Sequence, residues 1–375
     1  MREEADQGLS RSSTTDHPLP ITHHWMGIAF LACSCLSLVI TFLGFSQFDL
    51  PIVRYVRSVT IHLPWNQLTI PWMAFTSDMG DWIGEGTHLV VFSLVLVGAG
   101  WLFSSAAVRH AGIQTLLAHG LAALLVNGLK HLIGRPRPKF AHSGDWDVAP
   151  SWVSGFDSFP SGHSAASFAV ATVLAKRFPV FGPLCLGVAA FVMLSRVLRG
   201  SHFPTDVVGG AIVGVLSGAI AAAPLKEWRT SLRDGIGQSA VGAVVLLALL
   251  WSLARGPEEG IVGMLLSALG LAAIASGLWL RRTQWTGSER SGSSRHATMS
   301  SMLLWYGMAS MTTSLYVVAA AGLACLAYWL HQAGSLGEQT RDLRSWRMAR
   351  EGVLVSGVVL TLFMMYAGRG VLPFR

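Results

Sequence analysis

The ionisable residues of this 375-residue chain concentrate in three short segments, each beside a long apolar run. Charged side chains at membrane depth are costly, so such residues indicate functional sites. Lys130 to Pro138 (KHLIGRPRP) ends one apolar run, Pro160 to His163 (PSGH) opens the next, and Ser195 to Asp206 (SRVLRGSHFPTD) joins two more. Together they supply cations, histidines, a carboxylate and a Ser-Gly pair, which suit phosphoryl transfer.

The cations meet the main demand of that chemistry. The transition state spreads negative charge over three equatorial oxygens, so catalysis depends mostly on positioning and electrostatics. Lys130, Arg137 and Arg196 supply three positive charges, and an arginine fork can bind two phosphate oxygens at once. Ser161 and Gly162 open a predicted helix, whose amides and dipole can hold a further oxygen. These five residues are the predicted phosphate-binding set.

The two histidines have separate predicted roles. Asp206 follows His202 by four residues; if it fixes one ring nitrogen as a donor, the other nitrogen becomes a stronger nucleophile. His163 is then free to protonate the leaving oxygen as a general acid. His202, His163 and Asp206 are the predicted catalytic set.

Membrane helices must position these segments, because 52% of the residues are hydrophobic, 13% are charged and the mean hydropathy is +0.50. Apolar runs of about 18 or more residues recur along the chain. The expected fold is all-α and polytopic, with six spans in a core and about four in a C-terminal extension. The predicted spans are Trp25 to Gly44, Thr87 to Ala107, Ile113 to Ile133, Ser161 to Phe178, Phe181 to Val197, Thr205 to Leu225, Ser239 to Ala254, Ile261 to Leu280, Leu303 to Leu330 and Val353 to Ala367.

This division predicts a polar tail over residues 1–24, a core over 25–233 and an extension over 234–375. The first apolar run is too long for a typical signal peptide, so it is expected to remain as a span. The segment Phe48 to Glu85 mixes Arg and Trp with apolar residues, which suits either helices in the membrane interface or a plain connector. Alternating span direction places all three segments on one side of the membrane.

The three segments resemble the type 2 phosphatidic acid phosphatase (PAP2) superfamily, whose motifs are K-x6-RP, PSGH and SR-x5-H-x3-D. Every motif position is matched here, over roughly residues 25 to 225. The resemblance implies a six-helix core, a phosphohistidine at His202 oriented by Asp206, and a general acid at His163. It implies a phosphate pocket of Lys130, Arg137, Ser161, Gly162 and Arg196, with no cofactor.

Other chemistries are disfavoured. A serine triad of Ser161, His163 and Asp206 needs an oxyanion hole rather than three cations. A zinc site of His163, His202 and Asp206 would meet repulsion from the same cations, so no metal is expected. The remaining histidines are expected to be structural. Arg135, Lys139 and Arg199 could bind a second phosphate or contact lipid headgroups, and headgroup contact is the expectation. The acidic residues of the intervening loop, Asp145, Asp147 and Asp157, could shape substrate access, but they are expected to be solvated.

The net charge of +7 is scattered between apolar segments, which argues against nucleic acid as a partner. For bacterial members the resemblance implies an extracytoplasmic active site in the inner membrane, and most Lys and Arg outside the motifs fall in the opposite loops, as the positive-inside rule requires. The exceptions are Arg341, Arg344, Arg347 and Arg350, which suggests that the count of helices in the extension is wrong by one.

The predicted function is therefore hydrolysis of a phosphorylated or diphosphorylated membrane lipid, with undecaprenyl diphosphate, phosphatidate-type lipids and lipid A phosphate as candidate substrates. A phosphotransferase would share the first half of the reaction, so the sequence does not separate the two. A lipid transporter or scaffold without turnover is the alternative of another class. The oligomeric state has no signal in the sequence.

Overall fold

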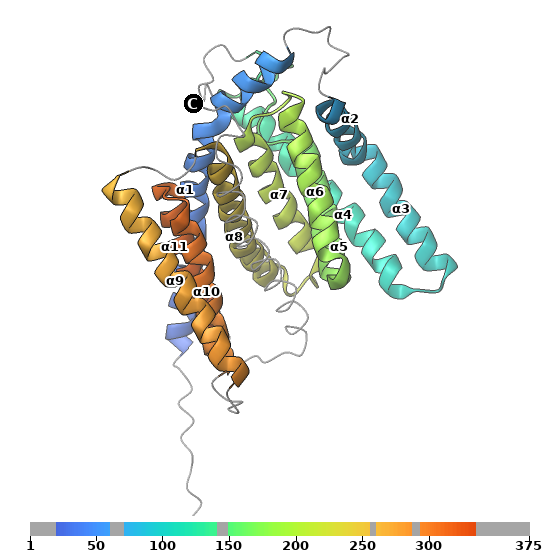
Figure 1. Ribbon diagram of the computed structural model, residues 1–375. Helices are drawn as coiled ribbons and strands as arrows, with labels where there is room; N and C mark the ends of the chain where they lie inside the picture. The colour runs from blue at the N-terminus through green and yellow to red at the C-terminus, as the bar shows by residue number, and fades with distance from the viewer. Residues whose placement is uncertain (1–19, 61–70, 141–148, 256–259, 287–292, 335–375) are drawn as a thin grey trace, which may run out of the picture.

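The computed structural model describes residues 20–60, 71–140, 149–255, 260–286 and 293–334 (Figure 1). Within these ranges the secondary structure is helical throughout, with no strand. The α-helices are α1 (Pro20–Thr60), α2 (Pro71–Gly84), α3 (Gly86–Leu102), α4 (Ala106–Ile133), α5 (Gly162–Arg177), α6 (Gly182–Leu198), α7 (Pro204–Ala222), α8 (Trp228–Ala254), α9 (Ile261–Thr286), α10 (Ser293–Met311) and α11 (Leu315–Gly334). Seven helices of the described part are long and apolar enough to cross a membrane, or eight counting the bent pair α2 and α3. The chain is thus an all-α multi-pass membrane protein, as predicted.

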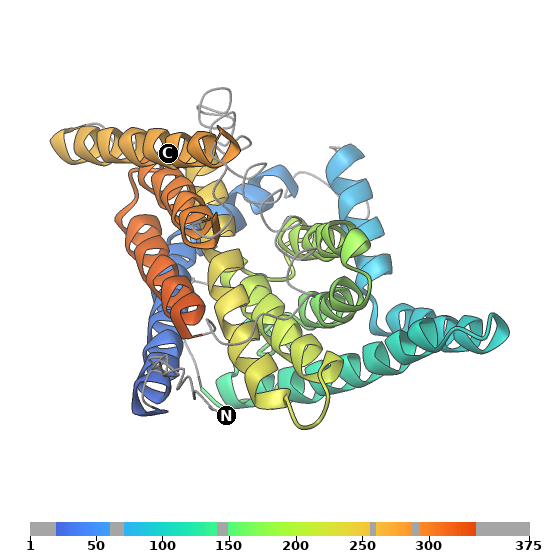
Figure 2. The same ribbon diagram turned by 90° about the horizontal axis from the view of Figure 1, so that it is seen from below.

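The helices form one bundle, and the three motif segments lie at one of its two ends. Figures 1 and 2 show α11 beside α1 and α9 beside α10 on the outer side of α11, while α3 and α4 form the opposite edge. The last turns of α4 and α6 and the first turns of α5 and α7 meet at the end drawn uppermost in Figure 1. This is the arrangement that alternating span direction predicts for the three motif segments.

Local sequence signals stop and start the helices at this end. Gly134 ends α4 in the left-handed conformation (φ 59°), and its amide donates to the carbonyl of Lys130 (2.8 Å). Glycine adopts this conformation without the steric cost of a Cβ. Pro204 occupies the first turn of α7, where its missing N–H costs nothing. The chain therefore turns sharply at both places, which brings the motif loops together.

Small residues let α5 and α7 pack closely beneath the loops. Gly210, Gly214 and Gly218 follow one another at four-residue spacing on α7. A Cβ at Gly214 would lie 2.4 Å from the carbonyl oxygen of Ala165, so only glycine permits this approach. The close packing fixes the start of α5 against the start of α7.

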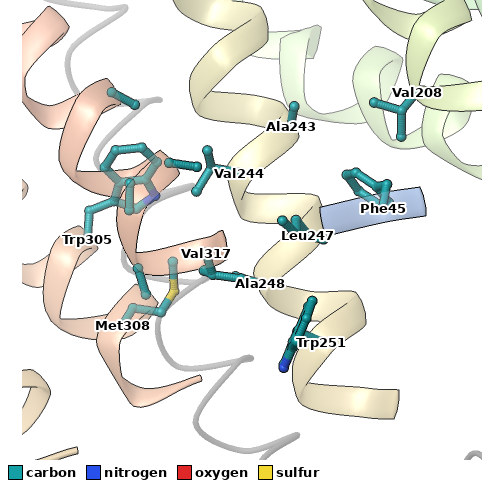
Figure 3. Packing of buried hydrophobic residues seen from close by; sticks show 14 of the residues in the cluster. Phe45, Val208, Ala243, Val244, Leu247, Ala248, Trp251, Trp305, Met308 and Val317 are labelled. Atoms are coloured by element: carbon teal, nitrogen blue, oxygen red, sulfur yellow. The ribbon is translucent and has the colours of Figure 1, made fainter. Parts of the chain in front are cut away.

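A hydrophobic cluster joins the C-terminal helices to α1. Its members on α8 include Leu247 and Trp251, and they pack against Phe45 of α1 and Val317 of α11 (Figure 3). Phe48 of α1 meets Trp251 edge to face, with ring centroids 5.2 Å apart. The extension therefore packs directly on the helix that contributes to the motif end of the bundle.

One predicted span is wrong, because Leu303 to Leu330 forms parts of two helices, α10 and α11. Thr313 between them has a positive φ of 57°. The Thr312 hydroxyl donates to the carbonyl of Ala309 (2.7 Å), and Ser314 accepts from the amide of Val317 (3.5 Å) as a helix cap. Serine and threonine side chains compete for backbone groups and so break an otherwise apolar helix.

The extra helix reverses the direction of the chain after α10. Ser37 of α1 donates to the carbonyl of Ala320 (2.9 Å), and Phe30 lies against His331 with ring centroids 5.4 Å apart. The helices α1 and α11 are therefore antiparallel, and α11 ends at the side opposite the motif loops. Up to Gly334, the sequence predicts three helices in the extension, whereas the structure has four, α8 to α11.

The remaining expectations differ from the structure in smaller ways. The first helix is longer than the span Trp25 to Gly44, since α1 continues to Thr60. The connector contains a helix, α2, bent by 53° relative to α3. The residues on either side of the predicted domain boundary, 233 and 234, lie inside α8. The last predicted span, Val353 to Ala367, lies outside the described residues, so this span and the domain division stay predictions.

Candidate active site

The structure brings the predicted catalytic and phosphate-binding residues to one end of the bundle, in two adjoining halves. One half contains Lys130, Arg137, His202 and Asp206, and the other contains His163 and Arg196. The amide of Ser161, which precedes α5, donates to the carbonyl of Asp206 on α7 (2.9 Å). This bond links the two halves at the closely packed α5–α7 interface.

His202 lies in the loop before α7, and 3% of its side chain is exposed. Its Nδ1 is 2.8 Å from the carbonyl oxygen of Ser158 and 3.7 Å from Oδ2 of Asp206. A carbonyl oxygen only accepts hydrogen bonds, so Nδ1 carries the proton and Nε2 keeps the lone pair. Burial lowers the pKa of His202 despite the opposing hydrogen bond and charge of Asp206, which leaves the ring neutral at neutral pH.

Asp206 organises the surroundings of that ring. Its carboxylate accepts hydrogen bonds from the hydroxyl of Ser158 (2.5 Å) and the amide of Phe203 (2.8 Å). Ser158 and Asp206 therefore both contact the ring of His202, and the carbonyl of Ser158 is the nearer of the two. The sequence assigned the orientation of this ring to Asp206 alone. Ser158 lies outside the three motifs, and its role depends on a contact that spacing alone does not reveal.

Arg135 is completely buried and holds Asp206 to α1. Its guanidinium contacts Oδ1 of Asp206 (2.6 Å) and Oδ2 of Asp49 (2.8 Å), and stacks over the ring of Phe203 at 4.1 Å. Thr205 donates to Asp49 from both its hydroxyl (2.6 Å) and its amide (3.0 Å). The expectation that Arg135 contacts headgroups is wrong, because it forms an internal link among α1, α7 and the loop.

Lys130 and Arg137 share one carboxylate, that of Asp157. Arg137 donates to it from Nε (2.8 Å) and from the terminal nitrogen (2.6 Å), and Nζ of Lys130 lies 3.6 Å away. The expectation of a solvated Asp157 is therefore wrong, while Asp145 and Asp147 lie outside the described residues. Burial would raise the pKa of Asp157, but hydrogen bonds and charge from Arg137, helped by Lys130, outweigh it and lower the pKa to about 2.

The second half of the site centres on Asp81 of α2, which lies outside the three motifs. Its carboxylate contacts Arg196, Arg199 (2.8 Å) and Nε2 of His163 (3.3 Å). A Cβ on Gly80 would lie 2.2 Å from the hydroxyl of Ser195 on α6, so α2 packs tightly here. Arg199 has an acidic partner, instead of the headgroup contact expected for it.

Arg196 keeps one donor available. Among the residues that the structure describes, its buried Nε has no hydrogen-bond partner, although a terminal nitrogen contacts Asp81. A buried, unpaired guanidinium N–H is unfavourable and would be satisfied by an oxygen of a bound anion. Arg196 shares the carboxylate of Asp81 with Nε2 of His163, which lies 3.3 Å from it.

Ser161 and Gly162 lie at the start of α5 as predicted, with Ser161 preceding the first helical residue. The amide of Ser161 is already bonded to Asp206, and its hydroxyl accepts from Ser164 (3.2 Å). The next amides of the first turn have no carbonyl one turn earlier to bond within the helix. These amides are therefore better placed than Ser161 to donate hydrogen bonds to a phosphate oxygen.

No metal centre is formed in the part of the chain that the structure describes, since it contains no suitably placed group of three or more His, Cys, Asp or Glu residues. His163, His202 and Asp206, the three ligands considered for zinc, instead have the separate partners given above. The donors that face the site are cationic, which suits an anion.

Comparison with known proteins identifies the family of the chain. The PAP2 superfamily model matches residues 111–229. Phosphatidylglycerophosphatase B of Bacillus subtilis is 34% identical over 157 residues, which cover 39% of this chain and 72% of that protein. The chain belongs to the PAP2 superfamily.

Two further PAP2 relatives match shorter stretches. Lipid A 1-phosphatase of Rhizobium johnstonii is 40% identical over 95 residues, or 25% of this chain and 39% of the relative. Undecaprenyl-diphosphatase of Bacillus subtilis is 30% identical over 135 residues, or 35% of this chain and 65% of the relative. The chain thus spans about two fifths of the length of the lipid A 1-phosphatase. No solved structure matches the chain.

The Asp157 contacts predict a pH-dependent contribution to stability. With a pKa of about 2 in the folded protein and about 3.9 when unfolded, the carboxylate stabilises the fold above pH 4, and this contribution is lost as the pH falls toward 2. Asp157→Asn should therefore lower the thermal unfolding midpoint by a constant amount between pH 5 and 7, and by less at pH 3. The midpoint of the detergent-purified protein checks this, with exposed Asp78→Asn as control. An equal difference at all pH values would contradict the pairing.

Proposed function

We propose that this chain is a lipid phosphate phosphatase that hydrolyses a phosphomonoester or diphosphate through a phosphohistidine on His202. The observation that carries the proposal is the tautomer of that ring, which the carbonyl of Ser158 fixes (2.8 Å). It leaves the Nε2 lone pair on a neutral imidazole within the electrostatic influence of Arg196 and Arg137. A nucleophile beside guanidinium groups suits attack on an anionic phosphorus centre.

The reaction follows from this arrangement in two steps. First, Nε2 of His202 attacks phosphorus, and the bond between phosphorus and the ester oxygen breaks. His163, which enters this step as the imidazolium beside the carboxylate of Asp81 (3.3 Å), gives its proton to the leaving oxygen. Water then attacks the phosphohistidine, giving a proton to His163, and the bond between phosphorus and nitrogen breaks. Phosphate leaves, and both histidines return to their starting states. Lys130, Arg137 and Arg196 balance the charge on the phosphoryl oxygens throughout.

A lipid is the proposed substrate because the site lies at one end of a bundle of membrane helices. The headgroup can reach the loops while the tails stay in the bilayer. The names of the relatives, a lipid A 1-phosphatase, a phosphatidylglycerophosphatase and an undecaprenyl-diphosphatase, favour the same class. Undecaprenyl diphosphate, phosphatidate-type lipids and lipid A phosphate are therefore the proposed candidates.

The proposed location is the bacterial inner membrane, with the active site on the extracytoplasmic face. Arg109 lies in the first turn of α4, and Lys176 and Arg177 lie in the last turn of α5. These helix ends are opposite to the ends that carry the motifs. The antiparallel α11 also ends there, so the arginines from 341 to 350, themselves outside the described residues, follow a helix that ends on the cation-rich side. This removes the exception to the positive-inside rule that a single helix over Leu303 to Leu330 would create.

The direct test uses the full-length protein in detergent with a panel of these lipid phosphates and a chelator. We expect release of inorganic phosphate from at least one of them without added metal. Equal amounts of phosphate released and lipid consumed identify a hydrolase, whereas lipid consumption without free phosphate identifies the phosphotransferase alternative. Absence of turnover on every substrate would favour a transporter or scaffold.

A further inference from the structure

The carboxylate of Asp81 contacts the proposed general acid from a helix outside the three motifs. Its Oδ1 lies 3.3 Å from Nε2 of His163, and it belongs to α2, which precedes all three motif segments in the chain. A carboxylate beside one ring nitrogen fixes the tautomer of a histidine and stabilises its protonated form. We propose that Asp81 is the positioning residue of the acid: it holds the N–H at Nε2, so that His163 protonates the leaving oxygen from Nδ1. This inference rests on the proposed function.

Close helix packing holds α2 against the ring of His163. A Cβ at Gly84 would lie 2.4 Å from Cγ1 of Val192 on α6, and 3.3 Å from Cδ2 of His163 on α5. Gly80, one turn earlier on α2, faces Ser195 of α6 at similarly short range. Two glycines at four-residue spacing therefore let α2 approach α6 closely, and Asp81 follows the first of them directly.

The same contacts decide which nitrogen of His163 is left for the substrate. Cδ2 and Nε2 are bonded neighbours in the imidazole ring, and Gly84 and Asp81 of α2 lie beside them. Nδ1 is the ring atom opposite that bond, so it is directed away from α2. With Nε2 held by a carboxylate, Nδ1 is the nitrogen that can give a proton to the leaving oxygen.

The surrounding charges explain why His163 needs a carboxylate. Arg196 and Arg199, at the end of α6, both contact Asp81. An imidazolium beside two guanidinium groups is disfavoured by repulsion, and Asp81, which contacts all three groups, offsets it. The other ionisable side chains at this end of the helices packed on α5 have partners of their own: Lys130 with Asp157, Glu85 with His88, and Asp206 with Arg135 and His202.

The proposed role is consistent with both steps of the reaction. His163 begins as the imidazolium, with a proton on each nitrogen. In the first step the bond between Nδ1 and its proton breaks and the leaving oxygen takes that proton, while the neutral ring keeps the N–H at Nε2 beside Asp81. In the second step the attacking water gives a proton to Nδ1. Asp81 accepts from Nε2 in both states, so it stays ionised and in place throughout turnover.

The test measures kcat and KM against pH for full-length Asp81→Asn in detergent, on whichever of the lipid phosphates named above the parent hydrolyses fastest, and on p-nitrophenyl phosphate. Asparagine keeps the shape of the side chain and removes its charge. We expect kcat on the lipid to fall about thirtyfold, and its alkaline limb to move about one pH unit lower. The loss on p-nitrophenyl phosphate should be small, because that leaving group needs no proton. Asp78→Asn, 82% exposed on the same helix, should match the parent.

A double substitution separates the contact with His163 from the contacts with the arginines. In a His163→Asn background, Asp81→Asn should change kcat by less than about twofold, because the acid on which it acts is already absent. An equal loss in both backgrounds, or a higher KM with an unchanged kcat, would show that Asp81 acts through Arg196 and would overturn the inference. An unchanged or higher kcat of Asp81→Asn in the parent background would overturn it as well.

Two further variants keep the inference testable if Asp81→Asn is not recovered folded, as checked by gel filtration. Because 34% of the Asp81 side chain is exposed, water can replace the carboxylate in Asp81→Ala, which then gives the same comparisons. Asp81→Glu keeps the charge and should keep the alkaline limb of the parent, and a limb moved to lower pH would overturn the inference. These outcomes leave the phosphatase proposal intact. A parent that hydrolyses no lipid phosphate would instead overturn the proposed function, and this inference with it.

Discussion

Replacing His202 with asparagine is expected to reduce phosphate release about a thousandfold or more, since the loss of a covalent nucleophile removes the reaction path itself. The atom responsible is Nε2 of the His202 ring. Nδ1 is held by the carbonyl of Ser158 (2.8 Å), so Nε2 is the nitrogen with a lone pair. Asparagine can replace the hydrogen bond to Ser158 but offers no nucleophile. Its fold should be preserved while turnover is lost.

The measurement is phosphate release by the parent and His202→Asn, together with trapping of the phosphorylated protein from a labelled substrate. The parent should carry acid-labile phosphate and the variant none. His110, which is exposed at the start of α4, away from the site, supplies the control variant His110→Asn, expected to match the parent. Phosphoprotein formed by His202→Asn would show that another residue is the nucleophile.

His163→Asn separates the two histidine roles. A general acid matters most when the leaving oxygen is basic, as in an alkyl phosphate, and least when the leaving group is a stable anion such as p-nitrophenolate. His163→Asn should therefore lose far more activity on a lipid phosphate than on p-nitrophenyl phosphate. His202→Asn should lose both activities. Equal losses of His163→Asn on the two substrates would argue against its acid role.

The sequence was sufficient for the residues whose spacing is local. Lys130 and Arg137 lie in one segment, and the helix ends that carry the motifs follow from Gly134 and Pro204. The alternating direction of the spans then predicts that the segments meet. These inferences depend on short-range signals, which a single sequence contains in full.

The partners of these residues were not predictable in the same way. Asp49 precedes Arg135 by 86 residues, and Asp81 precedes Arg196 by 115, so no spacing rule relates them. A signal did exist, because an acidic residue inside or beside an apolar helix is costly and requires a partner. Asp49 and Asp81 meet that criterion singly, whereas the predicted site depends on clusters of ionisable residues. The break between α10 and α11 was not predicted either, although the segment from Ser310 to Ser314 (SMTTS) contains the serines and threonines that mark it.

The second large effect is expected at the buried link between α1 and Asp206, the proposed catalytic aspartate. Arg135, with none of its side chain exposed, lies between Asp49 and Asp206. Replacing Arg135 with methionine would leave two buried carboxylates without their cation, a loss of about 3 to 5 kcal/mol. We expect a large decrease in the thermal unfolding midpoint and, in the protein that remains folded, a lower kcat, because Asp206 would no longer be held beside Ser158 and His202.

Asp49→Asn tests whether α1 contributes through this link or only by packing. The substitution retains the shape of the side chain but removes the charge that faces Arg135, while the contacts of Phe48 with Trp251 remain. In a double-mutant cycle on unfolding, Asp49→Asn and Arg135→Met should be coupled by about 1 to 3 kcal/mol. Arg109→Met, at the far end of α4, should show no coupling with Asp49→Asn. Additive effects of Asp49→Asn and Arg135→Met would mean that α1 and the extension support the active site only through hydrophobic packing. Coupling would show instead that the carboxylate of Asp49 on α1 acts on Asp206 through the buried guanidinium of Arg135.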